Sequence, residues 1–447
     1  MGKFLIYFSC AVLAAILLAG TIVSTMMLKG PPPEINAISA PRVIGREAVI
    51  SFRFHDSGRG IREITASIIQ GKKVVTLESK RFPVISWWKG TSIKDKIVSW
   101  QVAPLAMGLH QGKAILRATA RDASWRNDFN GNETTFQSEV VIDVTPPSIT
   151  VLSTIHNMIS GGAGLVSYKV NKDISRTGVW VDDIFFPAYP RPQGSAGEYS
   201  ALIAIPFDVP RPKLYIEAVD TAGNVAKTGF PYQIHYMAPK VDRINISDNF
   251  LEQKMPEFTA RYPDLTGTPL NIFLQVNSKL RTENDQEIKN ICLKSSPKIM
   301  WQGAFIRPPG AKRAGFADER HYFYNGKEIS QAHHMGVDIA ALAHFPVRAG
   351  NSGKVIFTGY LGIYGNAIII DHGFGLASLY GHLESINTAV GARVERGTII
   401  GTTDSTGLSG GDHLHYAMMV HGVFINPTEW WDDKWIKDHI INNLLAK

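Results

Sequence analysis

Two short stretches near the C-terminus, His334-Met-Gly-Val-Asp338 and His413-Leu-His415, decide how this sequence is interpreted. A histidine and a carboxylate four residues apart can converge on one ion where a glycine, here Gly336, lets the backbone turn sharply. In a strand, side chains alternate between the two faces, so His413 and His415 point to the same side. Two neutral imidazoles and one carboxylate suit zinc, with a fourth position left for water. The spacing therefore predicts a zinc site.

Histidine is concentrated around these stretches. Ten of the 14 histidines lie in the last 127 residues, far more than an even spread would place there. The same region contains Tyr380-Gly381-His382 and short alternating segments, such as 353–357 and 366–370, that predict strands. A His-Glu-x-x-His motif does not occur in the sequence, which excludes a thermolysin-type site.

About residues 301–430 resemble the M23 metallopeptidase family, also called LytM-type or lysostaphin-type peptidoglycan endopeptidases. The family's first motif is H-x-x-x-D and its second is H-x-H on a later strand. Further matches lie between and around these motifs: Ala349-Gly350-Asn-Ser-Gly353-Lys-Val355, Gly365-Asn366, Asp371-His372-Gly373, Leu379-Tyr380-Gly381-His382-Leu383, Ser405-Thr406-Gly407 and Asn426-Pro427.

The resemblance implies roles for five residues. His334, Asp338 and His415 would be zinc ligands, and His382 and His413 would be the catalytic histidines. The implied activity is zinc-dependent hydrolysis of the peptide cross-links of cell-wall peptidoglycan, with D-Ala–diaminopimelate bonds as the first choice. Which of the two histidines acts as the base stays open.

A second function stays open beside the enzyme. Some LytM-type domains have lost ligands and activate cell-wall amidases instead, so the alternative is a membrane-anchored, non-enzymatic regulator. All five zinc and catalytic positions are present here, which favours the zinc metalloendopeptidase.

Some positions near the motifs depart from the family or leave a choice. Phe316-Ala317 stands where Phe-Gly is more usual, which puts the shape of that loop in doubt. Family members often place a tyrosine before the first ligand, and here Tyr322 and Tyr324 are both candidates. His333 lacks an aspartate at the fourth following position, so we favour its neighbour as the ligand.

The N-terminal segment predicts a membrane helix. Residues 4–28 include no charged side chain and exceed the ~20 residues that a helix needs to cross a bilayer. A cleavable signal peptide has a shorter apolar region followed by a small-x-small site, of which Leu18-Ala19-Gly20 is a poor version. We expect an uncleaved anchor, with a cleaved signal as the alternative. The catalytic part would then lie outside the cytoplasm, in the periplasm or its equivalent.

Between the anchor and the motifs, the sequence predicts two β domains and a helical connector. Each predicted β domain ends in an alternating strand that reaches an aspartate, Asp122 or Asp220, before a turn. These passages resemble bacterial immunoglobulin-like repeats, and one larger irregular β domain is the alternative. In the connector, Thr268-Pro269 predicts a helix start, and Asn284 to Glu287 predicts a capping box for another helix.

The predicted fold is therefore mainly β, with an antiparallel-β LytM-type peptidase domain at the C-terminus. The final stretch, which includes Trp435, Ile436, Ile440 and Leu444, predicts an amphipathic helix packed on that domain. The expected parts are an anchor at 1–30, immunoglobulin-like domains at 31–145 and 146–236, a helical connector at 237–295, the peptidase domain at 296–430 and the C-terminal helix at 431–447.

Composition narrows the class of protein and its partners. With 447 residues the chain is too long for one core. The net charge of +7 comes without a basic block, so we expect no nucleic-acid partner. The cysteines Cys10 and Cys292 cannot staple a secreted scaffold, because the first lies in the apolar run. The expected partners are peptidoglycan and the inner membrane, together with a cell-envelope protein that would contact the immunoglobulin-like domains.

Overall fold

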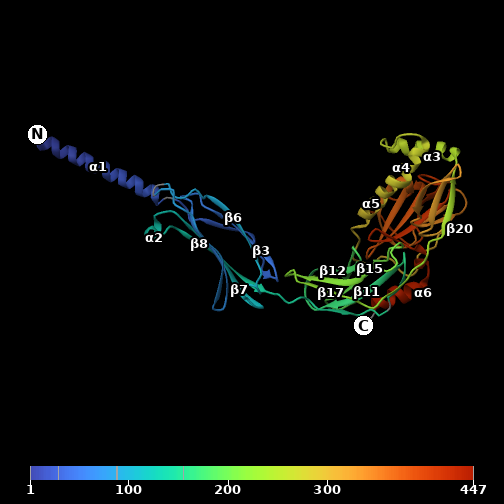
Figure 1. Ribbon diagram of the computed structural model, residues 1–447, viewed down its shortest axis with the longest axis horizontal. Coiled ribbons are helices and arrows are strands. Elements are labelled where there is room, and N and C mark those ends of the chain that lie inside the picture. Colours follow the sequence, from blue (N-terminus) through green and yellow to red (C-terminus); the bar gives the residue numbers. More distant parts are fainter. Residues whose placement is uncertain (1, 29, 87–88, 155, 446–447) are drawn as a thin grey trace. The chain divides into compact units, whose positions relative to one another are not determined.

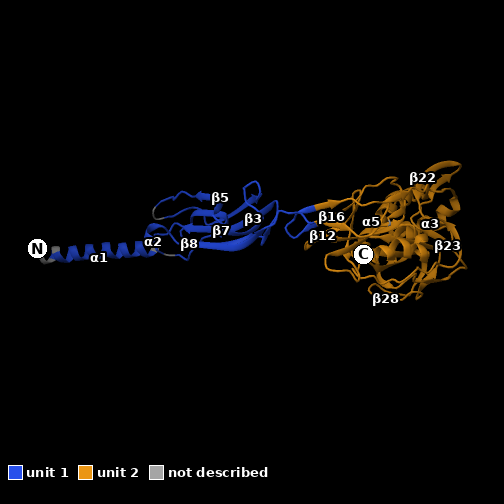
Figure 2. Cartoon of the chain, turned by 90° about the horizontal axis from the view of Figure 1, so that it is seen from below, with its two compact units in different colours: residues 1–147, 219–225 blue, residues 148–218, 226–447 orange. Residues whose placement is uncertain are grey.

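The computed structural model describes residues 2–28, 30–86, 89–154 and 156–445. Met1 and Lys29, which belong to the predicted anchor, lie outside the described residues. The chain divides into two compact units: residues 1–147 with 219–225, and residues 148–218 with 226–447 (Figure 2). The fold is mainly β, as predicted, with an apolar helix at the N-terminus (Figure 1).

The N-terminal helix α1 (Gly2–Met27) has no charged residue from Phe4 onward. Residues Ile6–Thr25 have a mean hydropathy of 2.4, and none of this stretch is buried against the protein. At ~1.5 Å per residue, the 26-residue helix is about 39 Å long, enough for a hydrocarbon layer of about 30 Å. By length and composition the helix is suited to cross a membrane, although a signal sequence has the same properties.

The first β domain consists of two sheets around one apolar core. In strand β7, Ala114, Leu116, Ala118 and Ala120 are buried, while the intervening residues are less so, which is the period of two expected for a strand. Asp122 ends this strand, as the sequence predicts. One sheet has the order β1 (Glu34–Ser39), β3 (Ala48–His55), β6 (Asp95–Val102), and the other β2 (Val43–Ile44), β8 (Glu133–Ile142), β7 (Gly112–Asp122), β4 (Ile61–Gln70), β5 (Lys73–Arg81).

The second β domain is also built from two sheets. Asp220 ends its strand β16, again as predicted. The first sheet has the order β14 (Tyr189–Pro190), β15 (Glu198–Ala204), β11 (Ala163–Val170), β9 (Ile149–Val151), and the second β13 (Ile184–Pro187), β12 (Ile174–Val181), β16 (Leu214–Asp220), β17 (Val225–Thr228). The short strands β10 (Asn157–Ile159) and β18 (Gln233–His235) pair in parallel. The immunoglobulin-like classification of both domains stays a prediction.

The connector begins with a strand and continues as helices. Thr268 caps its second helix by accepting a hydrogen bond from the Asn271 N–H, and Pro269 follows at the first turn, which confirms the predicted start. The predicted capping box is wrong, because the chain continues from that helix through a π-helical turn (Val276–Leu280) and Asn284 lies inside the next helix. The connector elements are β19 (Val241–Ile246), α3 (Asp248–Arg261), α4 (Pro269–Gln275) and α5 (Arg281–Cys292).

The C-terminal sheet is the largest in the chain's described part and is predominantly antiparallel. Its order is β20 (Ala311–Ala314), β23 (Val337–Ala340), β30 (Leu414–Val420), β27 (Leu376–Ile386), β26 (Asn366–Gly373), β25 (Gly353–Tyr360), β28 (Arg393–Val394), with β24 (Pro346–Arg348), β29 (Ile399–Thr403) and β31 (Val423–Ile425) beside it. A smaller sheet joins the connector strand β19 in parallel to β21 (Glu319–Tyr324), which pairs with β22 (Lys327–His333).

Both faces of this large sheet are covered, each by a different part of unit 2. In β30, Tyr416 and Met418 belong to the core shared with the second β domain, whereas Ala417 and Met419 belong to the core shared with the connector helices. The helices α3, α4 and α5 lie on that second face (Figure 1). Because side chains alternate along the strand, His415 has the parity of the face that the connector covers.

The C-terminal stretch packs as predicted, but it is not one regular helix. It forms a 3-10 turn (Pro427–Trp431), α6 (Asp433–Ile436), a π-helical turn (Lys437–Ile441) and α7 (Asn442–Leu445). Ile436, Ile440 and Leu444 are buried in the core that also contains the second β domain.

Glu429 links this stretch to the second β domain and should make stability depend on pH. Its Oε2 accepts a hydrogen bond from the Ala163 N–H at 3.0 Å. Burial raises the pKa of Glu429 from 4.5 to about 8. Between pH 4.5 and about 8, the Glu429 carboxyl is ionised in the unfolded chain but stays protonated in the folded protein. The free energy of unfolding should therefore fall as the pH rises through this window.

We therefore expect Glu429→Gln to raise the thermal unfolding midpoint above pH 8 and to leave it unchanged at pH 4. The measurement is thermal unfolding of wild type and variant between pH 4 and 9. The control is Glu283→Gln, which changes a glutamate whose side chain is 56% exposed. It should leave the unfolding midpoint unchanged both at pH 4 and above pH 8. A difference between Glu429→Gln and wild type that is constant with pH would contradict the assignment.

Candidate metal centre

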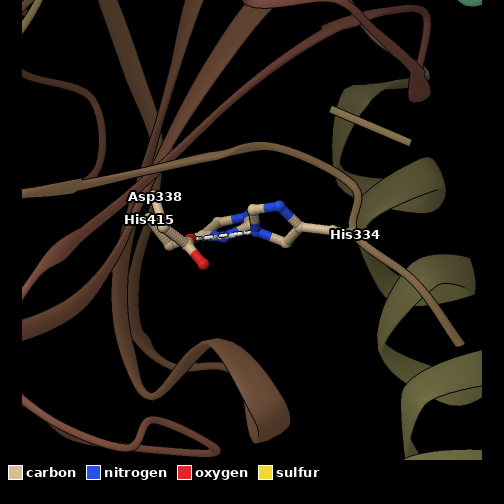
Figure 3. Close-up of side chains that lie close together, drawn as sticks. All are labelled: His334, Asp338 and His415. Carbon is tan, nitrogen blue, oxygen red and sulfur yellow. Dashed lines mark hydrogen bonds and ion pairs between the residues drawn. The ribbon is translucent and has the colours of Figure 1, made fainter. Parts of the chain in front are cut away.

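Strand register brings the two sequence motifs together. In the antiparallel pair of β23 and β30, Asp338 lies directly opposite His415. His334 comes just before β23, and its Nε2 lies 2.9 Å from Asp338 Oδ1 and 3.0 Å from His415 Nδ1. The third distance, from His415 Nδ1 to Asp338 Oδ1, is 3.0 Å. The three side chains converge on one point (Figure 3).

The donor set fits a metal ion. Ligand atoms ~2.05 Å from a tetrahedral zinc ion lie about 3.3 Å apart, close to the three separations found here. His334 Nδ1 lies 2.7 Å from the Gly315 carbonyl oxygen, so it donates its proton there and leaves the Nε2 lone pair for the ion. Among the described residues, these three form the group of His, Cys, Asp and Glu whose ligand atoms lie close enough together to bind a metal.

Gly336 serves the site by leaving space. A Cβ atom at this position would lie 2.6 Å from Nε2 of His415. The backbone bends at Gly336, as the sequence analysis expects, but without a positive φ. The glycine in the first motif is needed because the ring from the second motif passes over it.

The left-handed residue of this region is Ala317, with a φ of 62°. It occupies the position at which the family more usually has glycine, the residue that adopts this region of φ without steric cost. The Ala317 N–H donates to the carbonyl oxygen of His334 at 2.8 Å, and the His334 N–H donates to the backbone carbonyl oxygen of Asp318 at 2.9 Å. The loop therefore fixes the backbone of His334.

The two further histidines of the sequence prediction lie beside the three. His413 Nε2 is 3.5 Å from Asp338 Oδ1, and the ring centres of His382 and His413 are 4.8 Å apart. His382 Nδ1 donates to the Thr406 carbonyl oxygen at 2.7 Å, and His413 Nδ1 donates to the Gly411 carbonyl oxygen at 2.8 Å. Nε2 is therefore the nitrogen of each ring that remains available to accept or donate a proton.

Burial and one carboxylate set the electrostatics of the site. Burial would raise the pKa of Asp338, but the surrounding histidines, His334 first, lower it well below its usual value. Burial lowers the pKa of His382 well below 6.5 and that of His415 to about 4. Burial also opposes the charge on His413, but its hydrogen bond and attraction to Asp338 outweigh this effect and raise its pKa. Burial thus favours the neutral imidazole at His382 and His415, while the ionised Asp338 favours the protonated form of His413.

Arg320, which the sequence analysis did not single out, holds the other oxygen of the carboxylate. Its Nη2 donates to Asp338 Oδ2 at 2.7 Å, while the three histidines gather at Oδ1. Arg320 lies on β21, whose parallel partner is the connector strand β19. No spacing signal marks this arginine, because the contact arises from pairing between separate strands.

The site opens into a pocket of about 340 Å³, one wall of which comes from the connector. Tyr322 lines it, whereas the Tyr324 hydroxyl donates to Asp248, so the structure separates the two tyrosine candidates. The pocket thus joins ionisable groups to an apolar wall. The connector contributes Ile244, Asn245, Ile246, Phe250 and Phe273.

The neighbouring histidines have other partners. His333 packs its ring against Phe207 of the second β domain, with ring centres 4.8 Å apart. His372 is buried in β26, where its Nδ1 lies 2.8 Å from the Ser352 carbonyl oxygen and its Nε2 2.7 Å from Ser378 Oγ. Neither belongs to the metal-type group, which agrees with the choice of His334.

Comparison with known proteins identifies this part of the chain. Residues 332–427 match peptidase family M23. These residues form an M23 peptidase domain.

Curated relatives of the M23 domain include both enzymes and an activator. The DD-carboxypeptidase/endopeptidase Mpg of Neisseria meningitidis serogroup B is 45% identical over 94 residues, which cover 21% of this chain and 22% of Mpg. Peptidoglycan DD-endopeptidase ShyA of Vibrio cholerae is 37% identical over 95 residues, 21% of this chain and 22% of ShyA. Murein hydrolase activator EnvC of Escherichia coli is 34% identical over 95 residues, 21% of this chain and 23% of EnvC. The matches span about a fifth of the length of these relatives.

Solved structures similar to this chain include M23 proteins. A putative peptidase M23 from Pseudomonas aeruginosa covers 62% of this chain and 95% of its own, with a TM-score of 0.36 and 19% identity. The catalytic domain of lysostaphin from Staphylococcus simulans covers 33% of this chain and 96% of its own, with a TM-score of 0.22 and 29% identity.

Removing the carboxylate of the M23 domain's metal-type group should abolish metal binding. Asp338→Ala deletes one of three ligands and leaves two histidines, so we expect the purified full chain to lose its bound divalent metal. The measurement is metal content by elemental analysis, with His333→Ala as the matched control because that ring packs on Phe207. Full metal content in Asp338→Ala would show that the ligand assignment is wrong.

Proposed function

We propose that this chain is a membrane-anchored, zinc-dependent endopeptidase that hydrolyses the peptide cross-links of peptidoglycan outside the cytoplasm. The observation that carries the proposal is the convergence of five residues at one place: His334, Asp338 and His415 lie within ligand distance of one another, and all but His334 line the pocket together with His382 and His413. His334, Asp338 and His415 are the proposed zinc ligands, and His382 and His413 are the proposed catalytic residues.

Zinc held by these ligands would act as a Lewis acid that polarises the scissile carbonyl and makes water more acidic. The protein must then accept a proton from water and donate a hydrogen bond to the oxygen that gains negative charge. His382 and His413 can share these tasks through Nε2, because each ring is oriented by its Nδ1 hydrogen bond to a backbone carbonyl oxygen. A neutral ring would accept the proton at Nε2, and a ring in the imidazolium form would donate from Nε2 to the oxygen. The two rings divide these tasks between them.

The proposed substrate follows from the relatives and from the expected location. Mpg is named a DD-carboxypeptidase/endopeptidase and ShyA a peptidoglycan DD-endopeptidase. These names support a cross-link between D-amino acids as the substrate. Our first choice is the D-Ala–diaminopimelate bond. The pocket, with its apolar connector wall beside the ionisable groups, offers room for an aliphatic residue such as D-alanine next to the metal.

EnvC, a murein hydrolase activator, supports a second candidate function, a regulator without hydrolytic activity. A regulator acts by contacting another protein, so it has no use for two oriented histidines beside a metal-type group. The complete set of five residues in this chain therefore favours the enzyme.

Replacing His382 should separate catalysis from metal binding. Because three other residues supply the ligands, we expect His382→Ala to keep its zinc and its fold but to cleave cross-links ~10²–10⁴-fold more slowly. The measurement is cleavage of purified cross-linked muropeptides at matched zinc content. His344→Ala is the control, since that side chain is 59% exposed and pairs with Glu384.

Two results would contradict parts of this proposal. Equal cleavage by wild type and His382→Ala would remove His382 from the mechanism. No cleavage by the wild type on walls of different cross-link chemistry would instead favour the regulator.

We further propose that α1 remains on the mature protein as a single-pass anchor in the inner membrane, and that the β domains contact a cell-envelope protein. Its uninterrupted apolar surface supports this assignment. We expect the native protein to fractionate with membranes and to resist extraction by high salt, because the hydrophobic effect holds it there. N-terminal sequencing that starts near Thr21 would instead demonstrate a cleaved signal.

A further inference from the structure

Helix α3 of the connector reaches the M23 domain through two charged side chains. Glu257 Oε1 accepts hydrogen bonds from the Gly407 N–H at 3.0 Å and the Tyr360 hydroxyl at 3.1 Å. Lys254 Nζ donates to the Ser405 carbonyl oxygen and lies 3.5 Å from Glu257 Oε2. The side chains of Lys254 and Glu257 are only 16% and 24% exposed. Together they bind both ends of the turn formed by residues 405–407.

The middle residue of this turn is Thr406, whose carbonyl oxygen accepts the Nδ1 proton of His382 at 2.7 Å. The Thr406 side chain is held as well, because its Oγ1 donates to the Leu383 carbonyl oxygen at 3.0 Å and accepts from the Asn366 N–H at 3.1 Å. Two residues of the connector thus lie one turn away from a candidate catalytic ring.

The turn has little freedom to adopt another shape. Gly407 has a φ of 73°, and a Cβ atom there would lie 2.4 Å from the backbone nitrogen of Gly365. His382 itself has a φ of 59°, in the left-handed region that non-glycine residues rarely adopt. A backbone in this region persists only where its surroundings hold it. The ring that this backbone carries is oriented by its own hydrogen bond, from Nδ1 to the Thr406 carbonyl oxygen.

We propose that Lys254 and Glu257 are positioning residues for catalysis, which clamp the 405–407 turn so that Thr406 holds the His382 ring with Nε2 toward the pocket. The proposal rests on the proposed function, because it assigns His382 a chemical task. It makes the connector, which lies outside the matched residues 332–427, a working part of the active site.

Attachment of the helix does not explain the two charged residues. Leu251, Met255 and Phe258 of α3 are buried in the apolar core that the connector shares with the sheet. These side chains can hold the helix in place by burial alone. A lysine and a glutamate that are both mostly buried cost desolvation energy, and here their polar atoms are directed at one turn.

The test compares Glu257→Ala with Glu257→Gln and Met255→Ala in the full chain. Replacing a residue that orients a metal ligand typically costs about 10–100-fold, and we expect a loss of similar size where the oriented group is a catalytic histidine. Glu257→Ala should therefore lower kcat by about that factor with KM and zinc content unchanged. Glu257→Gln keeps an acceptor oxygen for the turn and should recover most of the rate. Met255→Ala lowers stability without touching the turn, and should leave kcat near that of the wild type at a temperature where both are folded.

A double variant tests whether the effect runs through His382. If Glu257 acts by orienting that ring, Glu257→Ala should cost nothing further in a His382→Ala background, since residues in one network are not additive. An equal loss in both backgrounds would overturn the proposal.

A spectroscopic readout makes the proposal independent of activity. In zinc-free protein with ¹⁵N-labelled histidine, the Nδ1 proton of His382 should be visible because it is buried and hydrogen-bonded. We expect this signal to disappear in Glu257→Ala and to remain in Glu257→Gln and Met255→Ala.

The outcomes separate this proposal from the proposed function. If the wild type is inactive but its His382 signal still depends on Glu257, the proposed endopeptidase activity is contradicted, whereas the proposed clamping of the 405–407 turn is supported. A signal and a kcat that are both unchanged in Glu257→Ala would overturn the clamp. Equal losses in Glu257→Ala and Met255→Ala at matched stability would also overturn it, because they would indicate general loosening of α3.

Discussion

The pairing of β23 with β30 is the constraint on which the rest of the site depends. It sets Asp338 opposite His415 although 77 positions separate them in the sequence. A shift of one residue in this register would turn one of the two side chains to the other face of the sheet. The register is held by burial on both faces, with Tyr416 and Met418 in one core and Ala417 and Met419 in the other. The same strand register therefore determines both the packing of the sheet and the geometry of the site.

The same alternation explains why the connector takes part in the site. His415 shares its parity with Ala417 and Met419, which face α3, α4 and α5. A metal-type group on this face must be open to substrate, yet the surrounding face must be covered. The connector meets both demands. Its helices bury this face of the sheet, whereas its strand β19 and the side chains of Phe250 and Phe273 line the pocket and leave it open.

The sequence predicts the parts of the site that rest on short-range patterns. His334 with Asp338, and His413 with His415, follow from spacing, and His382 follows from the family resemblance. Arg320, Lys254 and Glu257 could not be predicted, because their contacts join strands or helices that are distant in sequence and no periodicity marks them. Asn284 was misassigned as a cap for a similar reason: its Oδ1 accepts from the Ile363 N–H at 3.0 Å, a tertiary contact made from within a helix.

At the level of the fold, the apolar helix, the alternating strands and the Thr268 cap were predictable because local chemistry determines them. The shared cores were not. Trp430 is buried beside Trp301 and Phe305, with ring centres 5.5 and 5.8 Å away, so the C-terminal stretch packs through large side chains from separate segments. A helical period gives the inward face of such a stretch but not the surface that it contacts.

Arg320 determines how Asp338 can serve a metal. A free carboxylate can offer both oxygens to an ion, which would occupy the position that a catalytic site must leave for water. Here Arg320 takes Oδ2 at 2.7 Å, and Oδ1 alone faces the three histidines. The arginine also compensates part of the carboxylate's charge, so the buried group is paired on both of its oxygens. One oxygen from Asp338 and one nitrogen each from His334 and His415 would make three ligands, a number that would leave a fourth position of a tetrahedral ion for water.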